Sequence, residues 1–295
     1  MPTDIRWIAS APASCFHAAE ALSRGQPLTD AALADAISVP TAALRAEVVA
    51  AGLPREAFWQ HLVALSTGIE NHRQLAQRVL AKTIGPGSRQ EQLGDVVARH
   101  FVDLSHAFNA ALPGLVEQLE LRSAPLREQW EGRGPGLLHE TARLTDPEFV
   151  VATADVVLVH PALGGGGAAH LLYNSVRLEA MLANPWPQLP EVARLGWLIA
   201  QLNLDLPKHQ GELNRDQAAR LGALALTPIT LAAGEAVELT RCDPGSLQSA
   251  LTIWQSPAAT IPAGALAASL WDWWQVYRDT RPAWPVAIAA LARML

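Results

Sequence analysis

A strand-like run followed closely by four glycines, within residues 155–184, constrains the fold more than any other part of the sequence. The run DVVLVHP at residues 155–161 is rich in β-branched residues, which predicts a strand over residues 154–160. The glycines that follow are Gly164, Gly165, Gly166 and Gly167. Glycine adopts backbone angles closed to other residues and lets another group approach the chain closely. We therefore expect a loop that either binds a ligand or makes a tight turn, with positive φ or close backbone contact at Gly165 and Gly166.

Residues 170–184 are open to two interpretations. The stretch NSVRLEAML alternates apolar and polar residues as a half-buried strand does, whereas its Leu, Glu, Ala and Met favour a helix. We favour the strand. On a strand, Arg177 and Glu179 share one face, opposite Val176 and Leu178. Two opposite charges on one face are typical of a solvated surface, and beside a glycine loop they also suit contact with an extended peptide.

Helical patterns account for most of the remaining chain. Apolar spacing and capping residues predict short N-terminal helices at residues 4–23, 30–38, 41–52, 54–66 and 70–82. Later helices are expected at residues 89–112, 114–132, 189–204, 263–278 and 283–294. The sequence thus predicts an α+β fold that is predominantly α-helical, with many helices around a small sheet of two to four strands near residues 154–184.

A cluster of helix-breaking residues suggests where the chain divides. The stretch KTIGPGSRQEQ at residues 82–92 interrupts helical periodicity with two glycines, a proline and a serine. We expect it to join an N-terminal helical subdomain, residues 1–84, to a main α+β domain, residues 89–295, whose C-terminal part is helical.

The charge and hydropathy of the chain bound its partners and compartment. The formal net charge is -6 and no run of Lys or Arg occurs, so nucleic acid and anionic membrane are not expected partners. The uncharged stretch at 244–271 is interrupted by polar residues and prolines, which argues against a spanning helix. The first residues lack the basic and apolar regions of a signal peptide. With only Cys15 and Cys242, far apart in sequence, the chain is expected to be soluble and cytoplasmic.

The glycine loop is the main candidate site. Successive backbone N–H groups can cradle a phosphate, but no Lys-Ser or Lys-Thr follows the glycines and GGGGAA does not complete the G-x-G-x-x-G spacing. A turn is therefore favoured over a nucleotide site, and no cofactor is expected. His160 and His170 flank the loop, with Asn174 or Glu179 as a neighbouring oxygen donor. Two histidines at this spacing form no recognised metal motif, so we expect no metal.

Signatures of hydrolases are incomplete. In LLHETARL, His139 and Glu140 begin an H-E-x-x-H motif, but Arg143 replaces the second histidine. The order of helices, strand, glycine loop, edge strand and buried helix resembles that of zincin metallopeptidases. The buried helix at 189–204 has no histidine and only Glu191, so the resemblance implies a noncatalytic relative. No G-x-S-x-G nucleophile motif occurs, and both cysteines are expected to be buried apolar residues rather than nucleophiles.

Tryptophan is unusually frequent, with ten residues in the chain. Aromatic residues concentrate near the C-terminus, at Trp271, Trp273, Trp274, Tyr277 and Trp284. Packing in the core is favoured, with an aromatic anchor for a peptide, partner or ligand as the alternative.

These observations favour a noncatalytic binding or protein-interaction protein that recognises a peptide or small ligand with its glycine loop and neighbouring strand. The alternative is a hydrolase-type enzyme, such as a divergent metallopeptidase-like protein, with His160, His170 and Glu179 near a pocket. The sequence leaves the oligomeric state open. The residues expected to bind the partner are His160, Gly164, Gly165, Gly166, Gly167, His170, Asn174, Arg177 and Glu179.

Overall fold

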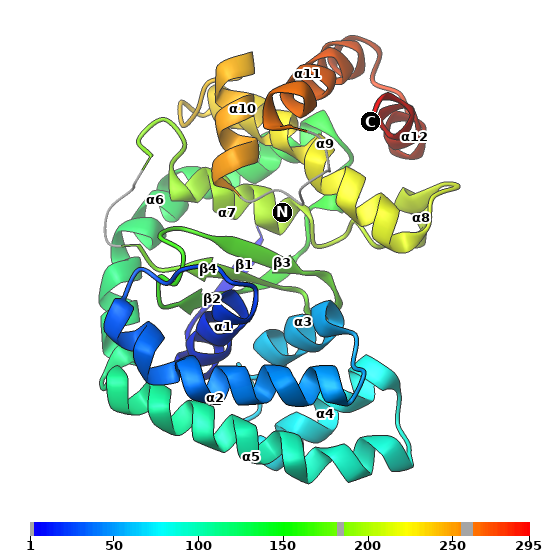
Figure 1. Cartoon of the computed structure of the whole chain (residues 1–295). Helices are drawn as coiled ribbons and strands as arrows, with labels where there is room; N and C mark the ends of the chain where they lie inside the picture. Colours follow the sequence, from blue (N-terminus) through cyan, green and yellow to red (C-terminus); the bar gives the residue numbers. More distant parts are fainter. Residues whose placement is uncertain (1–2, 182–185, 255–261) are drawn as a thin grey trace.

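A computed structural model describes residues 3–181, 186–254 and 262–295 of the chain. It confirms the expected fold class, a predominantly helical α+β protein with a small mixed sheet (Figure 1). The expected division near residue 84 concerns independent folding and stays a prediction. No helix in the described ranges is both long enough and apolar enough to span a bilayer.

The sheet has four strands in the order β1-β2-β4-β3. The strands are β1 (Asp4–Ala9), β2 (Thr153–Val159), β3 (Gly167–His170) and β4 (Ser175–Glu179). Strands β1, β2 and β4 are parallel, whereas β3 pairs with β4 in the antiparallel direction. The strand expected at 154–160 and the strand interpretation of 174–182 are therefore confirmed as β2 and β4, while residues 182–185 lie outside the described residues.

Helices cover both faces of the sheet (Figure 1). The helices that precede β2 are α1 (Ala11–Ser23), α2 (Ala31–Ala50), α3 (Arg55–Leu65), α4 (His72–Ile84), α5 (Ser88–Ala111) and α6 (Leu115–Leu144). Those that follow β4 are α7 (Glu191–Ala200), α8 (Pro207–Gln210), α9 (Arg215–Ala236), α10 (Pro244–Ile253), α11 (Ala263–Thr280) and α12 (Trp284–Met294). Two 3₁₀ turns span Pro147–Phe149 and Leu171–Tyr173.

The chain begins with a strand, so the helix expected over residues 4–23 is wrong in its first part. Strand β1 pairs with β2 in register, with Arg6 opposite Asp155, and the Arg6 guanidinium binds that carboxylate. Ser10 then caps α1 by accepting the N–H of Ala13. Pairing with a distant strand thus overrides a local pattern compatible with helix.

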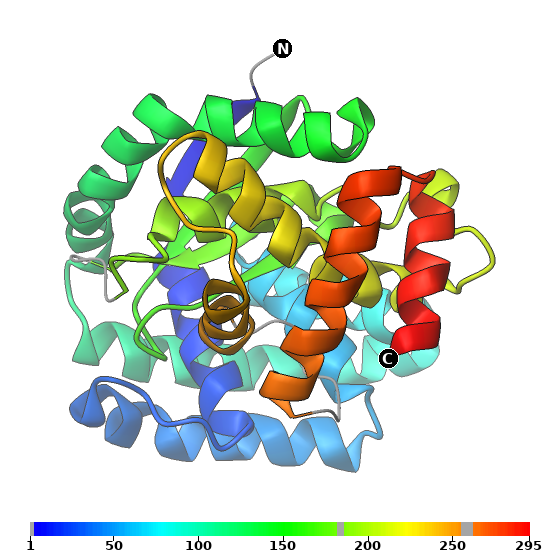
Figure 2. The same cartoon turned by 90° about the horizontal axis from the view of Figure 1, so that it is seen from above.

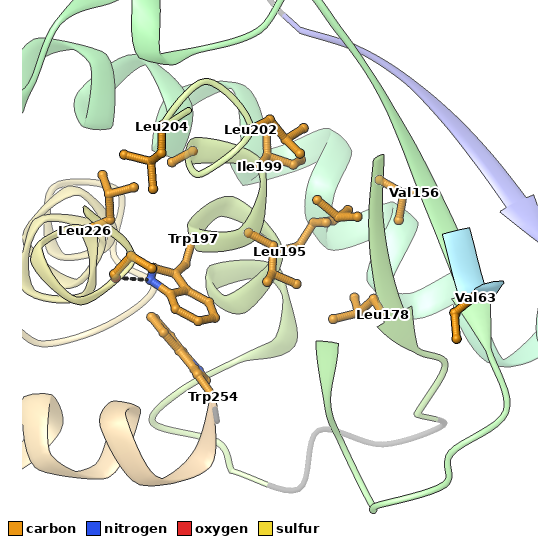
Figure 3. Close-up of a cluster of buried hydrophobic side chains, with 14 of the residues drawn as sticks. Val63, Val156, Leu178, Leu195, Trp197, Ile199, Leu202, Leu204, Leu226 and Trp254 are labelled. Atoms are coloured by element: carbon orange, nitrogen blue, oxygen red, sulfur yellow. Dashed lines mark hydrogen bonds between the residues drawn. The ribbon is translucent and has the colours of Figure 1, made fainter. Parts of the chain in front are cut away.

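The two faces of the sheet differ in what covers them. Val157 and Val159 of β2 pack with Ala13 of α1 on one face. The alternating residues, Val156 and Leu178, point to the other face and belong to the main core, where α7 packs against β3 and β4 (Figure 3).

Helix α7 is fully buried in the main core, as expected for the helix at 189–204. On its far side the indole N–H of Trp197 donates to the carbonyl of Ala223, and the Trp197 ring lies 5.5 Å from that of Trp254 (Figure 3). The sheet is therefore fixed between two layers of helices.

The tryptophans near the C-terminus pack mainly in the core, as favoured above. Trp273 stacks on Tyr277 with ring centroids 5.0 Å apart, and the Tyr277 hydroxyl donates to the carbonyl of Leu144. Trp274 and Trp284 are also buried, whereas Trp271 is half-buried. Figure 2 shows α11 and α12 side by side at one edge of the molecule, both against α9.

The connection from β2 to β3 has an unusual course that positions the candidate site. Strand β4 lies between β2 and β3, although both precede it in the chain. The segment 160–166 must therefore cross the carboxyl end of β4 before β3 begins. That end of β4 carries Glu179.

Candidate functional site

The crossing segment 160–166 is held along its length by hydrogen bonds. The N–H of His160 donates to the Ser14 hydroxyl on α1 at 2.9 Å. Thr29 binds the next part of the segment, because its hydroxyl donates to the carbonyl of Pro161 and its N–H donates to the carbonyl of Ala162. These hydrogen bonds hold the glycine loop in place where the chain crosses from β2 to β3.

Positive φ occurs at two successive glycines of the loop. Gly165 has φ of +112°, as expected, and Gly164 has φ of +83°. Gly166, the other glycine expected to need a positive φ or close backbone contact, does not have a positive φ. These angles turn the N–H groups of Leu163 and Gly165 towards the same carboxylate.

The anion in this backbone cradle is the side chain of Glu179. Its Oε1 accepts the N–H of Leu163 at 3.0 Å and its Oε2 accepts the N–H of Gly165 at 2.7 Å. The main-chain N–H of Glu179 in turn donates to the carbonyl of Gly166. The backbone cradle that was weighed as a phosphate site, and set aside in favour of a turn, therefore exists, and the side chain of Glu179 fills it.

His17 on α1 completes the environment of this carboxylate. Its Nε2 lies 2.9 Å from Oε1 of Glu179, and both side chains are buried. Burial favours a higher pKa for Glu179, but the hydrogen bond from His17 and the loop N–H groups hold that pKa below its usual value. Burial and the charge of Arg177 lower the pKa of His17. We therefore assign an ionised Glu179 that accepts Nε2–H from a neutral His17.

A second buried carboxylate on α1 engages the other charge of β4. Arg177 Nη1 donates to Oε2 of Glu20 at 2.9 Å, and Arg24 Nη2 lies 2.8 Å from Oε1 of the same residue. Burial favours a higher pKa for Glu20, but the charges of Arg177 and Arg24 hold that pKa below its usual value. The carboxylates of Glu20 and Glu179 and the guanidinium groups of Arg24 and Arg177 therefore balance in charge where α1 meets β4.

The interpretation of Arg177 and Glu179 as a solvated face is wrong. The alternation is correct, since both side chains point to the same face of β4, but α1 covers that face. Their side chains retain only 11% and 1% of their exposed area. Each of these buried charges is already bound to an opposite charge or to N–H groups. Both side chains therefore have a structural role.

His170 and Asn174 lie at the other end of the strands from Glu179. His170 is opposite Ser175, which is opposite Asp155 near the start of β2. Asn174 adopts a left-handed conformation in the β3–β4 turn, and its Nδ2 donates to the carbonyl of Thr153. This is a turn-stabilising contact.

The two histidines that flank the loop do not share a site. His160 follows the last residue of β2 and lies beside the Glu179 end of the sheet. Five residues of strand separate it from the level of His170, or more than about 15 Å at the usual rise. The residues expected around one pocket therefore form two groups, with His160, Gly164, Gly165, Gly166, Gly167 and Glu179 at one end, His170 and Asn174 at the other, and Arg177 between them.

His170 is itself buried without a hydrogen-bond partner for either ring nitrogen in the described part of the chain. Burial, with the nearby charge of Arg177, lowers its pKa to about 3. Beside it, Nδ1 of His61 lies 2.7 Å from the hydroxyl of Tyr173. Burial raises the pKa of that hydroxyl to about 12.

A small hollow of about 50 Å³ opens beside the buried charges. Its walls include His17 and Glu20 from α1, Arg24 directly after α1, Gly166 from the loop and Gly167 at the start of β3. The volume suits one or two water molecules rather than an organic substrate.

Sequence reasoning missed the partners that α1 and its C-cap residue contribute, namely Ser14, His17, Glu20 and Arg24. They recur at intervals of three or four residues, which places them on one face of a helix. The available signal was the presence of His17 and Glu20 within APASCFHAAEALS, a helix that is otherwise almost wholly apolar or small. Polar residues on the inward face of such a helix need buried partners.

The described residues offer little support for metal binding or for nucleophilic catalysis. Nowhere in residues 3–181, 186–254 and 262–295 do three His, Cys, Asp or Glu side chains gather closely enough to hold a metal ion. Glu140 of the partial H-E-x-x-H motif pairs with Arg143 at 2.7 Å. Burial raises the pKa of the free Cys15 thiol, and it raises that of Cys242 to about 11, so neither is an activated thiolate.

Comparisons with protein-family models, with curated proteins and with solved structures find no match for this chain.

Proposed function

We propose that the protein is a noncatalytic binding protein that accepts an extended peptide along the outer edge of β3. The observation that carries this proposal is an unpaired strand edge next to the ordered glycine loop. Strand β3 is the last in the sheet order, and Gly167, Ala168 and Ala169 are half-buried rather than covered. An exposed edge of this kind is a template for main-chain pairing with another chain.

The hydrogen-bond pattern identifies which groups are free. Glu179 N–H donates to the carbonyl of Gly166, so Gly166 and Glu179 form a hydrogen-bonded pair. In an antiparallel ladder such pairs alternate, which turns the N–H and C=O groups of Gly167 and Ala169 outward. Among the described residues, no hydrogen bond to these outward groups is found. Two residues thus offer two donors and two acceptors to a partner.

The side chains of the edge favour close approach. Gly167 and the two alanines present almost no bulk, so an incoming backbone can reach pairing distance. Gly167 is also required by its own surroundings, because a Cβ there would lie 2.7 Å from Cδ1 of Leu198.

The buried charges supply rigidity to this edge. Glu179 fixes the loop that leads into β3, and Arg177, which is opposite Ala168, fixes β4 to α1. An edge that is ordered before binding loses less conformational entropy on binding. In this proposal Arg177 and Glu179 support the recognition surface and do not touch the partner. The two free cysteines lead us to place the activity in a reducing, cytoplasmic compartment.

The hydrolase alternative receives no comparable support. Its three residues, His160, His170 and Glu179, are divided between the two ends of the strands.

A peptide selected from a random heptapeptide library tests the proposal. The selected peptide is resynthesised with each backbone nitrogen methylated in turn, and its affinity is measured by fluorescence polarisation. Main-chain pairing predicts that methylation at alternate positions weakens binding by about tenfold, whereas methylation at the intervening positions has little effect.

The matching protein variant is Ala169→Pro, which removes an outward N–H and leaves the ladder with β4 intact. Its control is Ala169→Ser, which retains the N–H. We expect Ala169→Pro to lose about tenfold in affinity and the control to bind as the wild type does. Equal binding by both variants, or a methylation scan without alternation, would refute pairing at β3.

A further inference from the structure

A second cavity, of about 670 Å³, lies between the C-terminal end of α1, the helix α2 and the first turn of α3. This volume is within the range of small-molecule sites. Three arginines line it, one from each region: Arg24, Arg45 and Arg55. Glu56 is the one carboxylate in its lining. The lining therefore carries an excess of positive charge, within a chain whose formal net charge is -6.

The arginines are available to a ligand to different extents. Within the part of the chain that the structure describes, neither Arg45 nor Arg55 has an ion-pair partner. Arg24 is held by Glu20 and keeps 47% of its side-chain area exposed. Guanidinium groups that face one cavity repel one another, and a bound oxyanion converts that repulsion into charge-assisted hydrogen bonds.

The first turn of α3 adds to the positive field. Its N-cap residue, Pro54, supplies no side-chain acceptor to the first N–H groups of the helix. Arg55 and Glu56 of this turn line the cavity. An uncapped helix start carries a partial positive charge, which acts together with the three arginines.

The wall of the cavity is apolar where Val48 and Trp59 contribute. Both residues are buried, with 1% and 3% of their area exposed, and Trp59 is fixed against Phe58 with ring centroids 5.7 Å apart. These two residues therefore present little surface to a ligand, and the three arginines dominate what the cavity offers.

We propose that this cavity binds a small organic anion, with its phosphate or carboxylate group on Arg24, Arg45 and Arg55. The site is separate from the β3 edge and does not depend on peptide binding there.

Isothermal titration calorimetry with three related probes tests the proposal. Phenyl phosphate and phenylacetate carry the two candidate anionic groups, and 2-phenylethanol is their neutral counterpart. We expect one-to-one binding of at least one anion, and at least about tenfold weaker binding of the alcohol. The stronger of the two anions identifies the group for which the arginines are arranged.

Charge-neutralising variants locate the site. Arg45→Gln combined with Arg55→Gln is expected to weaken binding of the anion by at least about tenfold. Arg99→Gln, at an exposed position of α5, removes one charge away from the cavity and is expected to leave the affinity unchanged. Failure of both anions to bind at about 10 mM, or equal binding by the double variant and the wild type, overturns the proposal.

Discussion

Nε2 of His17 lies 2.9 Å from Oε1 of Glu179, and this contact joins the first helix to the strand β4 across 162 positions of the sequence. The same carboxylate accepts two N–H groups of the glycine loop. One side chain therefore fixes three segments, namely α1, β4 and the crossing between β2 and β3. The stability of the loop and the docking of α1 should consequently depend on each other.

Glu179→Gln is expected to destabilise the protein by about 2 to 4 kcal/mol, because the amide offers an N–H to a site built from N–H donors. Urea unfolding measures this loss, and hydrogen exchange at Leu163 and Gly165 should accelerate. The control is Glu140→Gln, whose Arg143 partner is more than half exposed and whose loss should cost under about 1 kcal/mol. Equal losses of unfolding free energy in the two variants would contradict the conclusion that Glu179 holds α1, β4 and the crossing segment together.

The buried pair of Glu20 and Arg177 should be strongly coupled. In a double-mutant cycle with Glu20→Gln and Arg177→Gln, we expect a coupling free energy of about 1 to 3 kcal/mol, since either single change leaves a buried charge. The comparison cycle uses Arg73 and Asp95, which are 2.8 Å apart with about two-thirds of each side chain exposed. There the coupling should stay under about 1 kcal/mol. A coupling at Glu20 and Arg177 no larger than that of the surface pair would count against a structural role.

The glycines of the loop should tolerate side chains poorly. Gly165→Val is expected to cost about 1 to 3 kcal/mol, because φ of +112° is strained for a β-branched residue. Gly132→Ala is the control, since this helical glycine has no neighbour within 4 Å of an added Cβ and should become slightly more stable. Thermal unfolding compares the two variants. If Gly165→Val unfolds at the temperature of the wild type, the loop conformation is not required.

Local signals in the sequence were sufficient for β2, β4 and the glycine loop. The β-branched run of β2 and the alternation of β4 express their strand preference within a few residues, and the run of glycines marks a segment in which positive φ occurs, although not which glycines adopt it. For β1 the local sequence pattern was misleading, because it is compatible with a helix. Its strand conformation depends on pairing with β2, with Arg6 opposite Asp155 far along the chain. A parallel pairing of this kind leaves little trace in a window of six residues.

The candidate site was harder to predict than the fold because it depends on which face of the sheet is covered. Alternation correctly placed Arg177 and Glu179 on one face, but only the position of α1 shows that this face is buried. Strand β3 was also missed as a paired strand, since glycine and alanine have low strand propensity. Its strand conformation comes from the crossing over Glu179, which delivers the chain to the free side of β4.

Stability should fall in mild acid, and His170 should account for part of the fall. Burial, with the charge of Arg177, lowers its folded-state pKa from 6.5 to about 3. Between these values the unfolded chain binds a proton that the folded chain does not, so the contribution is complete above pH 6.5 and is lost as the pH falls towards 3. One histidine adds at most about 1.4 kcal/mol per pH unit to this slope.

His170→Gln removes the side chain that binds this proton in the unfolded chain. The unfolding free energy of the variant should therefore fall less steeply than that of the wild type between about pH 7 and pH 5. Urea unfolding at several pH values gives both slopes. His17 and His61 also face this region with lowered pKa values, and the ionised Glu20 and the cation Arg177 lie beside them, so the slope should be reduced rather than abolished. His106→Gln, at an exposed position of α5, should retain the slope of the wild type. If His170→Gln retains it as well, the imidazole of His170 must already be protonated, or accessible to protons, in the folded protein. The buried neutral state assigned to it would then be wrong.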